Sequence, residues 1–94
     1  MQKYVYNGRK AKRGEMKVGD IVSDIEPAGL MAAELFKVAR IDETRFYMEW
    51  LGHYDSETQT VDASGSTGYR AEKDGTYMFI NDNLFNPFLS VDLA

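Results

Sequence analysis

The clearest pattern in the chain is a pair of runs, residues 35–41 and 45–51, in which apolar and polar residues largely alternate. In the second run Phe46, Met48 and Trp50 share one face of an extended chain, because successive side chains of a strand point to opposite sides. Only three polar residues separate the two runs. The pattern therefore predicts a β-hairpin whose second strand turns its aromatic face toward the core.

Shorter runs of the same kind predict the other strands. Residues 3–6 are rich in residues that favour extended structure. Residues 87–94 alternate cleanly, with Leu89 and Val91 on one side, and Pro87 suits the first position of a strand. This alternation is typical of a half-buried strand. Further strands are expected at residues 17–25, 69–72 and 76–80, the last two joined by an Asp-Gly turn.

These elements predict an all-β fold. Residues 26–35 are the one helical candidate, because they are rich in good helix formers. Six or seven short strands with at most one short helix indicate a single domain over residues 1–94, folded as a small barrel or β-roll. The order "KVGDIV", a loop, "FKVARI" and a turn into "FYMEW" is similar to that of many SH3-like small barrels. This resemblance covers about half of the chain and implies a fold, not an activity.

Residues 52–68 are rich in Ser, Thr, Asp and Gly, and we interpret them as one long surface loop. Gly52 is expected to turn the following side chains out of the hairpin. Loops of this length are uncommon in compact domains and are often functional. The candidate contacts with a ligand or partner in this loop are His53, Tyr54, Asp55, Ser64, Ser66 and Thr67.

The composition narrows the class of protein. There is no cysteine among the 94 residues, which excludes disulfides, thiolate metal sites and cysteine catalysis. The N-terminal residues contain no apolar run typical of a secretory signal, and no stretch reaches the length of a membrane helix. We therefore expect a soluble, cytoplasmic protein without a membrane partner.

The net charge of −4 is unevenly distributed. Residues 1–18 hold six Lys or Arg and one Glu, whereas residues 19–94 hold five basic and fourteen acidic residues. The basic segment either balances the acidic remainder within the fold or attracts an anionic ligand. A nucleic acid or nucleotide is the alternative partner, because aromatic rings beside cations can stack on bases. Its candidate residues are Tyr4, Tyr6, Arg9, Lys10, Lys12 and Arg13.

Two further features of the sequence each allow a structural and a functional interpretation. The Gly/Ser-rich turn at residues 63–68 is either a plain loop or a nest of backbone N–H groups that binds an anion. Phe85 and Phe88 either plug the end of the barrel or anchor a partner, as aromatic side chains do at interfaces.

Catalytic chemistry has little support in the sequence. His53 is the only histidine, and a zinc site built from one histidine and carboxylates is uncommon. Asp55 could orient His53, but a hydrolase also needs an activated nucleophile. We predict a non-catalytic binding module without metal or cofactor, such as an accessory or inhibitor protein that occupies a protein partner or an anionic ligand. Nucleic-acid or nucleotide binding is the second hypothesis, and a hydrolase centred on His53 is the third.

Overall fold

The computed structural model describes residues 1–27 and 32–92, and these residues form an almost entirely β structure. This result confirms the predicted all-β class. A single turn of 3-10 helix, η1 (Asp82–Leu84), precedes the last strand. The strands are β1 (Gln2–Tyr6), β2 (Ile21–Ser23), β3 (Glu34–Asp42), β4 (Arg45–Asp55), β5 (Thr60–Asp62), β6 (Tyr77–Phe79) and β7 (Asn86–Asp92).

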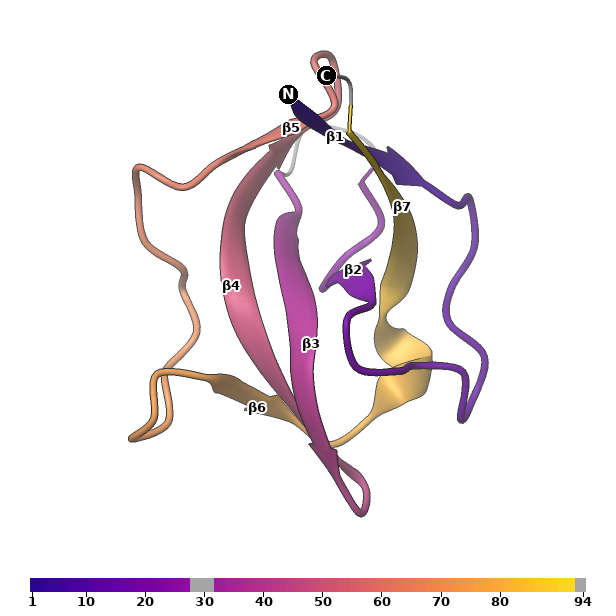
Figure 1. Cartoon of the computed structure of the whole chain (residues 1–94), viewed down its shortest axis with the longest axis vertical. Coiled ribbons are helices and arrows are strands. Elements are labelled where there is room, and N and C mark those ends of the chain that lie inside the picture. Colours follow the sequence, from indigo (N-terminus) through magenta and orange to yellow (C-terminus); the bar gives the residue numbers. More distant parts are fainter. Residues whose placement is uncertain (28–31, 93–94) are drawn as a thin grey trace.

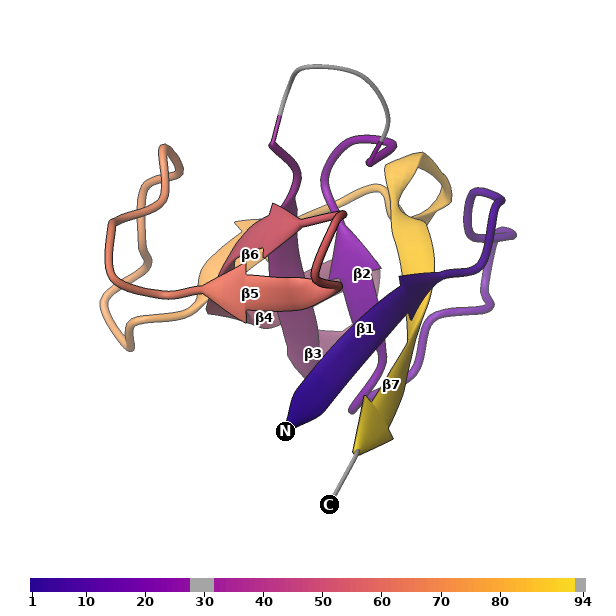
Figure 2. The same cartoon turned by 90° about the horizontal axis from the view of Figure 1, so that it is seen from above.

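All of these strands join one antiparallel sheet that curls into a nearly closed barrel (Figures 1 and 2). The strand order is β1-β7-β2-β3-β4-β5, and β6 pairs with β4 near the β3–β4 turn. β1 and β5 are the two edge strands of this order. The Tyr4 N–H of β1 donates a 2.8 Å hydrogen bond to the carbonyl oxygen of Gln59, the residue before β5, and so bridges the gap between them. The predicted small barrel is therefore confirmed.

The predicted hairpin is present as β3 and β4, the two longest strands. A β-bulge interrupts its register: Leu35 pairs with Gly52 and Phe36 pairs with Trp50, so that Leu51 is an extra residue on β4. Gly52 has a φ of +145°, and a Cβ there would lie 2.6 Å from the carbonyl oxygen of Asp62. A bulge exchanges the faces of the residues that follow it. Tyr54, after the bulge, therefore packs with Leu35 in one part of the core, whereas Met48, before the bulge, packs with Phe36 in another.

The prediction of one long loop over residues 52–68 is wrong. β4 continues to Asp55, and β5 then pairs with it in antiparallel register, Tyr54 opposite Val61. The long irregular segments lie elsewhere, at residues 7–20 and 63–76, and they extend from opposite sides of the barrel (Figure 1).

Two other expected strands are shorter than predicted or absent. Of residues 17–25 only Ile21–Ser23 form a strand, because a turn comes first: the Asp20 N–H donates to the Lys17 carbonyl at 3.1 Å. The Asp-Gly turn is present, with a 2.7 Å hydrogen bond from the Glu72 N–H to the Thr76 carbonyl. Residues 69–72 nevertheless form no strand, and β6 pairs with β4 instead.

The helical candidate over residues 26–35 is tested only in part. Residues 28–31 lie outside the described residues, whereas Glu34 and Leu35 already belong to β3. In the described part of the chain there is no long apolar helix of the kind that crosses a bilayer.

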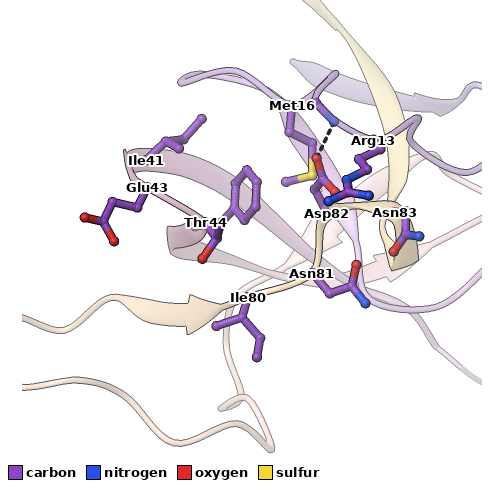
Figure 3. A pocket seen from close by; sticks show the side chains of 11 residues that line it. Arg13, Met16, Ile41, Glu43, Thr44, Ile80, Asn81, Asp82 and Asn83 are labelled. Carbon is purple, nitrogen blue, oxygen red and sulfur yellow. Dashed lines mark hydrogen bonds between the residues drawn. The ribbon is translucent and has the colours of Figure 1, made fainter.

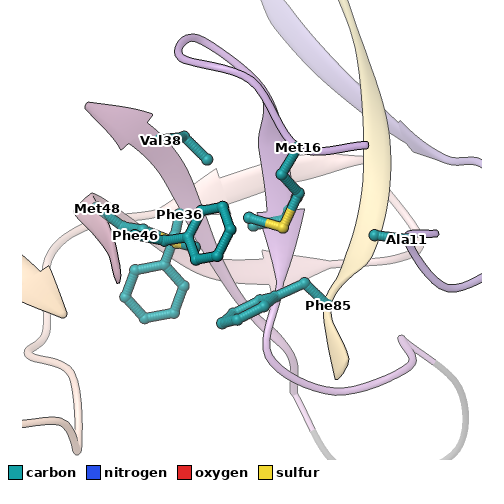
Figure 4. Packing of buried hydrophobic residues seen from close by; sticks show 8 residues of the cluster. Ala11, Met16, Phe36, Val38, Phe46, Met48 and Phe85 are labelled. Atoms are coloured by element: carbon teal, nitrogen blue, oxygen red, sulfur yellow. The ribbon is translucent and has the colours of Figure 1, made fainter. Parts of the chain in front are cut away.

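The core consists of two clusters, and neighbouring β3 residues belong to different ones: Phe36 to the first cluster and Leu35 to the second. This division follows from the alternation of side chains along a strand. Figure 4 shows the first cluster, in which the rings of Phe36 on β3, Phe46 on β4 and Phe85, the residue before β7, meet. Its buried members are Ala11, Met16, Val22, Phe36, Val38, Phe46, Met48 and Phe85. The buried members of the second cluster are Ala33, Leu35, Tyr54 and Phe88.

The apolar pattern of the last strand is reversed relative to expectation. Leu89 and Val91 are 57% and 41% exposed, whereas Phe88, on the opposite face, is buried. β1 and β2 flank β7, and their apolar side chains pack with Phe88 in the second cluster. The alternation therefore identified a strand but assigned the wrong face to the core.

Candidate functional site

The end of β4 holds the three adjacent residues that the sequence assigned to an exposed loop. Tyr54 is only 8% exposed, and its hydroxyl donates a 2.6 Å hydrogen bond to the carbonyl oxygen of Tyr4. This burial raises the pKa of the Tyr54 phenol. Asp55 accepts a 2.9 Å hydrogen bond from the Glu57 N–H and so shapes the turn that leads to β5. Tyr54 is therefore a core residue and Asp55 a turn residue, and neither is presented on a loop.

His53 is half-buried between side chains of the β3–β4 hairpin. Its Nε2 lies 3.6 Å from Oε1 of Glu34, and its ring meets the Trp50 indole edge-on at 5.4 Å between ring centroids. Asp55, the carboxylate expected to orient the imidazole, is hydrogen-bonded within its own turn instead. Within residues 1–27 and 32–92, no group of three or more histidine, cysteine or carboxylate side chains is arranged to hold a metal ion.

The Gly/Ser-rich turn at residues 63–68 is organised by a carboxylate. Asp62 Oδ1 accepts hydrogen bonds from both the N–H and the hydroxyl of Ser64, at 2.9 and 2.6 Å, and these bonds lower the pKa of Asp62. Thr67 Oγ1 accepts a 3.2 Å bond from the Tyr69 N–H, and Ser66 is exposed. The donors of Ser64 are thus occupied by Asp62, which argues against an anion nest at this position.

The N-terminal aromatic side chains pack mainly against the core. Tyr4 and Tyr6 both pack against the second cluster, and the Tyr6 ring lies 5.4 Å from that of Phe88. Burial and the charge of Glu26 raise the pKa of Tyr6. These rings therefore offer less free surface for stacking than a pair of exposed tyrosines would.

The basic residues divide into one that is paired and three that are not. Arg9 forms an ion pair with Glu15, and this contact, together with the Lys12 N–H, lowers the pKa of Glu15 to about 2. Lys10, Lys12 and Arg13 are exposed, and no carboxylate of the described chain forms an ion pair with any of them. Within the described chain, Arg9 is therefore the residue of this group with an ion-pair partner, while Lys12 acts on Glu15 through its charge at longer range.

Phe85 and Phe88 are 4% and 6% exposed, one in each core cluster. The first of the two interpretations, that they fill the barrel, agrees with this burial. Side chains this deeply buried present almost no surface on which a partner could anchor.

An exposed apolar surface that the sequence analysis did not identify lies beside β6. Here the chain crosses from β6 to η1 and β7, and a groove of about 400 Å³ follows one side of this crossing. Four of its side chains are large, apolar and exposed: Tyr69 at 39%, Met78 at 37%, Ile80 at 69% and Leu84 at 55%. We call this the apolar groove; its remaining lining residues are Asp24, Phe79, Asn81 and Phe85.

Tyr69 forms one wall of the apolar groove and holds the 63–76 segment against the barrel. Its ring packs edge-on against Phe36 and Phe79, at 5.6 and 5.3 Å. Its hydroxyl donates a 2.9 Å hydrogen bond to Asp24 Oδ2. Burial and this carboxylate raise the pKa of Tyr69 to about 12. Asp24 is itself fixed, because its other oxygen accepts the N–H groups of Ile25 and Glu34.

A second hollow of about 450 Å³ lies on the other side of the same crossing, and we call it the basal pocket (Figure 3). The β1–β2 segment, the β3–β4 turn and residues 80–83 line it, so Ile80 and Asn81 border both hollows. Of the residues predicted from the sequence, Arg13 lines the basal pocket and Phe85 lines the apolar groove.

One signal in the sequence could have located the apolar groove. The run Tyr-Met-Phe-Ile at residues 77–80 is apolar at every position, so an extended strand there must be apolar on both faces. One face packs in the core through Tyr77 and Phe79, and the other reaches the surface through Met78 and Ile80.

No family model, no curated protein and no solved structure matches this chain. The similarity of the strand order to SH3-like barrels therefore stays a prediction.

Proposed function

We propose that the protein is a non-catalytic binding module that docks a protein partner through the apolar groove. The observation that carries this proposal is the gathering of four large exposed apolar side chains along one hollow. Soluble domains seldom expose large apolar side chains as a contiguous patch. Where such a patch has a polar rim, it commonly marks an interaction site. Aromatic and methionine side chains, represented here by Tyr69 and Met78, are also enriched at interfaces.

The chemistry of the groove favours a partner that presents apolar side chains. Among the described residues that line it, the ionisable groups are Asp24, which accepts two backbone N–H groups, and the Tyr69 phenol bonded to it. A phosphate backbone would find no cation among these residues, whereas a leucine or aromatic anchor would bury its surface against Ile80 and Leu84. An accessory or inhibitor protein that covers a partner's apolar surface fits this arrangement, and the cysteine-free composition supports a cytoplasmic setting.

The test compares groove variants with a matched control. Ile80→Asp and Leu84→Asp place a carboxylate on the groove, and Leu89→Asp does the same on β7, where Leu89 is as exposed as Leu84. Partners captured from the native host by wild-type protein are identified by mass spectrometry, and the affinity of each purified partner is measured by titration.

Both groove variants are expected to weaken binding at least about 30-fold, the effect of losing a hot-spot residue, while Leu89→Asp binds as wild type does. Circular dichroism checks that all three variants are folded. The proposal fails if every partner binds the groove variants as tightly as the control.

A second candidate function is nucleic-acid or nucleotide binding through the basic β1–β2 segment. The observation that favours it is the set of exposed, unpaired cations Lys10, Lys12 and Arg13. If they contact phosphates, single-stranded DNA should bind at low salt with an affinity that falls steeply as salt rises. The triple substitution to Gln should flatten this salt slope, and absence of salt-sensitive binding by wild type would eliminate this candidate.

A further inference from the structure

β6 pairs with another strand along one of its edges only. It faces residues 46–48 of β4, and no other described strand pairs with it. Outside that pairing, no hydrogen bond joins the backbone of residues 77–80 to the rest of the described chain. Along its second edge β6 therefore keeps N–H and C=O groups without a partner among the described residues. Such an edge is a template for pairing with another chain.

The residues of β6 do not protect this edge. Native proteins commonly guard an unpaired edge with charged side chains, proline or a bulge, but residues 77–80 read Tyr-Met-Phe-Ile. The edges of β1 and β5, by contrast, approach each other and share the bond from the Tyr4 N–H to the Gln59 carbonyl. Among the described strands, β6 thus has an edge that neither a partner strand nor its own side chains protect.

The apolar groove runs along this free edge. Phe79 packs against the first core cluster, whereas Met78 and Ile80 are exposed on the other face of the chain, yet all three line the groove. Side chains from opposite faces of a strand can border one hollow where it follows the edge of the strand. The other edge of β6 is occupied by β4. The hollow of about 400 Å³ therefore lies beside the unpaired backbone.

We propose that the partner enters the apolar groove as an extended segment and pairs with the free edge of β6 as an added strand. This inference rests on the partner binding proposed above and specifies how the partner is recognised. The backbone of the segment bonds to β6, and its side chains alternate between two faces. Every second side chain enters the groove against Phe79 and Tyr69, and the side chains between them lie beside Met78 and Ile80. The recognised segment is therefore apolar at alternate positions.

Other occupants use the groove less completely. A helix forms its backbone hydrogen bonds within itself, so it would fill the groove but leave the edge of β6 unpaired. A second copy of this chain could offer its own β6, but each copy carries a net charge of −4 and the two charges would repel. An extended segment without acidic residues satisfies both the apolar side chains and the backbone of β6.

The first experiment reads the spacing of apolar residues in peptides that the protein itself selects. A phage-displayed library of short random peptides is selected on wild-type protein, and the enriched peptides are synthesised and titrated. We expect apolar residues at positions i and i+2, the period of a strand. Ile80→Asp should weaken these peptides at least about 30-fold, whereas Leu89→Asp, equally exposed on β7, should not weaken them. Circular dichroism checks that both variants are folded.

The second experiment tests the backbone contact without changing any side chain. The tightest peptide is made in two series, each with single N-methyl groups at alternate residues. In an added strand the N–H groups of one series point toward β6 and those of the other point away. We expect each methyl group of the first series to weaken binding about tenfold, through loss of one hydrogen bond and a steric block, and the second series to change it little. Amide exchange in β6 should slow when the unmodified peptide binds.

Strand addition is overturned if the selected peptides place apolar residues at i, i+3 and i+4, or if the two N-methyl series weaken binding equally. In either case sensitivity to Ile80→Asp would still support partner binding in the groove, so the two proposals fail separately. A selection that yields no peptide sensitive to Ile80→Asp overturns both. Sedimentation of wild-type protein alone adds one more test: a dimer that Ile80→Asp abolishes would assign the edge of β6 to a second copy and not to a partner segment.

Discussion

The hydroxyl of Tyr54 donates a 2.6 Å hydrogen bond to the backbone carbonyl of Tyr4, fifty residues earlier in the chain. The Tyr4 N–H in turn donates to the Gln59 carbonyl at 2.8 Å. Tyr4 of β1 is therefore tied to the β4–β5 hairpin through both its backbone N–H and its backbone carbonyl. These two bonds lie where the ends of the sheet approach each other, so they help to close the barrel.

Tyr54→Phe tests the contribution of this contact to stability. The ring stays in the second cluster, but the Tyr4 carbonyl loses a donor in a part-buried position. We expect the free energy of unfolding to fall by about 1–2 kcal/mol. Urea denaturation measures this change. Tyr47→Phe is the matched control, because the Tyr47 hydroxyl forms no hydrogen bond with residues 1–27 or 32–92 and Arg40 stacks over its ring. A loss no greater than that of the control would show that the bond to Tyr4 is dispensable.

Gly52 is the residue that allows β5 to approach the end of β4. Gly52→Ala would place a Cβ 2.6 Å from the Asp62 carbonyl oxygen, at a φ that side chains rarely adopt. We expect a loss of about 2–3 kcal/mol in unfolding free energy, together with exposure of Tyr54 to solvent.

The control for this substitution is Gly68→Ala. Gly68 has open space around its Cβ position and a φ outside the left-handed region, so its replacement should change stability by less than about 1 kcal/mol. Equal stability of the two variants would mean that β4 can shift away from Asp62 at little cost.

Gly52 also explains which parts of the fold could be predicted from the sequence. The β3–β4 hairpin is evident because the register of Ile41 opposite Phe46 follows from local alternation and a short turn, whereas the pairing of Val38 with Met48 already lies beyond a register shift between Val38 and Arg40. At Gly52 the sequence predicts the start of a loop and an exposed Tyr54, whereas β4 continues past the bulge at Leu51 and buries Tyr54 in the second cluster with Leu35. A bulge depends on the close approach of Asp62 from another strand, which is a tertiary contact that no local pattern contains.

The candidate site was harder to predict for a similar reason. The apolar run at residues 77–80 indicates buried structure, and half of it is buried. Only the pairing of β6 with β4, where residues 69–72 had been expected as its partner, determines that Met78 and Ile80 reach the surface. Arg13 was identified as an exposed cation, but its position opposite Glu43 depends on three segments meeting at the base of the barrel.

The Arg9–Glu15 ion pair predicts an unusually acidic carboxyl group. Glu15 should titrate at about 2, and Arg9→Gln should return the pKa part of the way toward its ordinary value of 4.5, since the bond from the Lys12 N–H remains. A lowered pKa means that the pair stabilises the fold above about pH 4.5 and that this contribution is lost as the pH falls toward 2. Carboxyl NMR titration measures both values. Lys10→Gln should leave them unchanged, and an ordinary pKa in wild type would contradict the pairing.

Tyr69 predicts a loss of stability at high pH. Its pKa is raised from 10.0 to about 12, so the folded state favours the neutral phenol, which donates to Asp24 and packs on Phe79. A group whose pKa is raised by folding stabilises the protein fully below its unfolded pKa. That contribution is therefore present below about pH 10 and disappears as the pH rises from about 10 to about 12.

Tyr69→Phe isolates this effect from the other tyrosines with raised pKa values, Tyr6 and Tyr54, because their contributions are common to both proteins. At neutral pH the variant should be less stable than wild type, since it lacks the bond to Asp24. Between pH 10 and 12 wild type should lose stability faster, because a phenolate formed beside Asp24 is repelled and releases the 63–76 segment from the apolar groove. Melting temperatures of both proteins across this range measure the difference, and parallel curves would show that Tyr69 ionises without leaving its position.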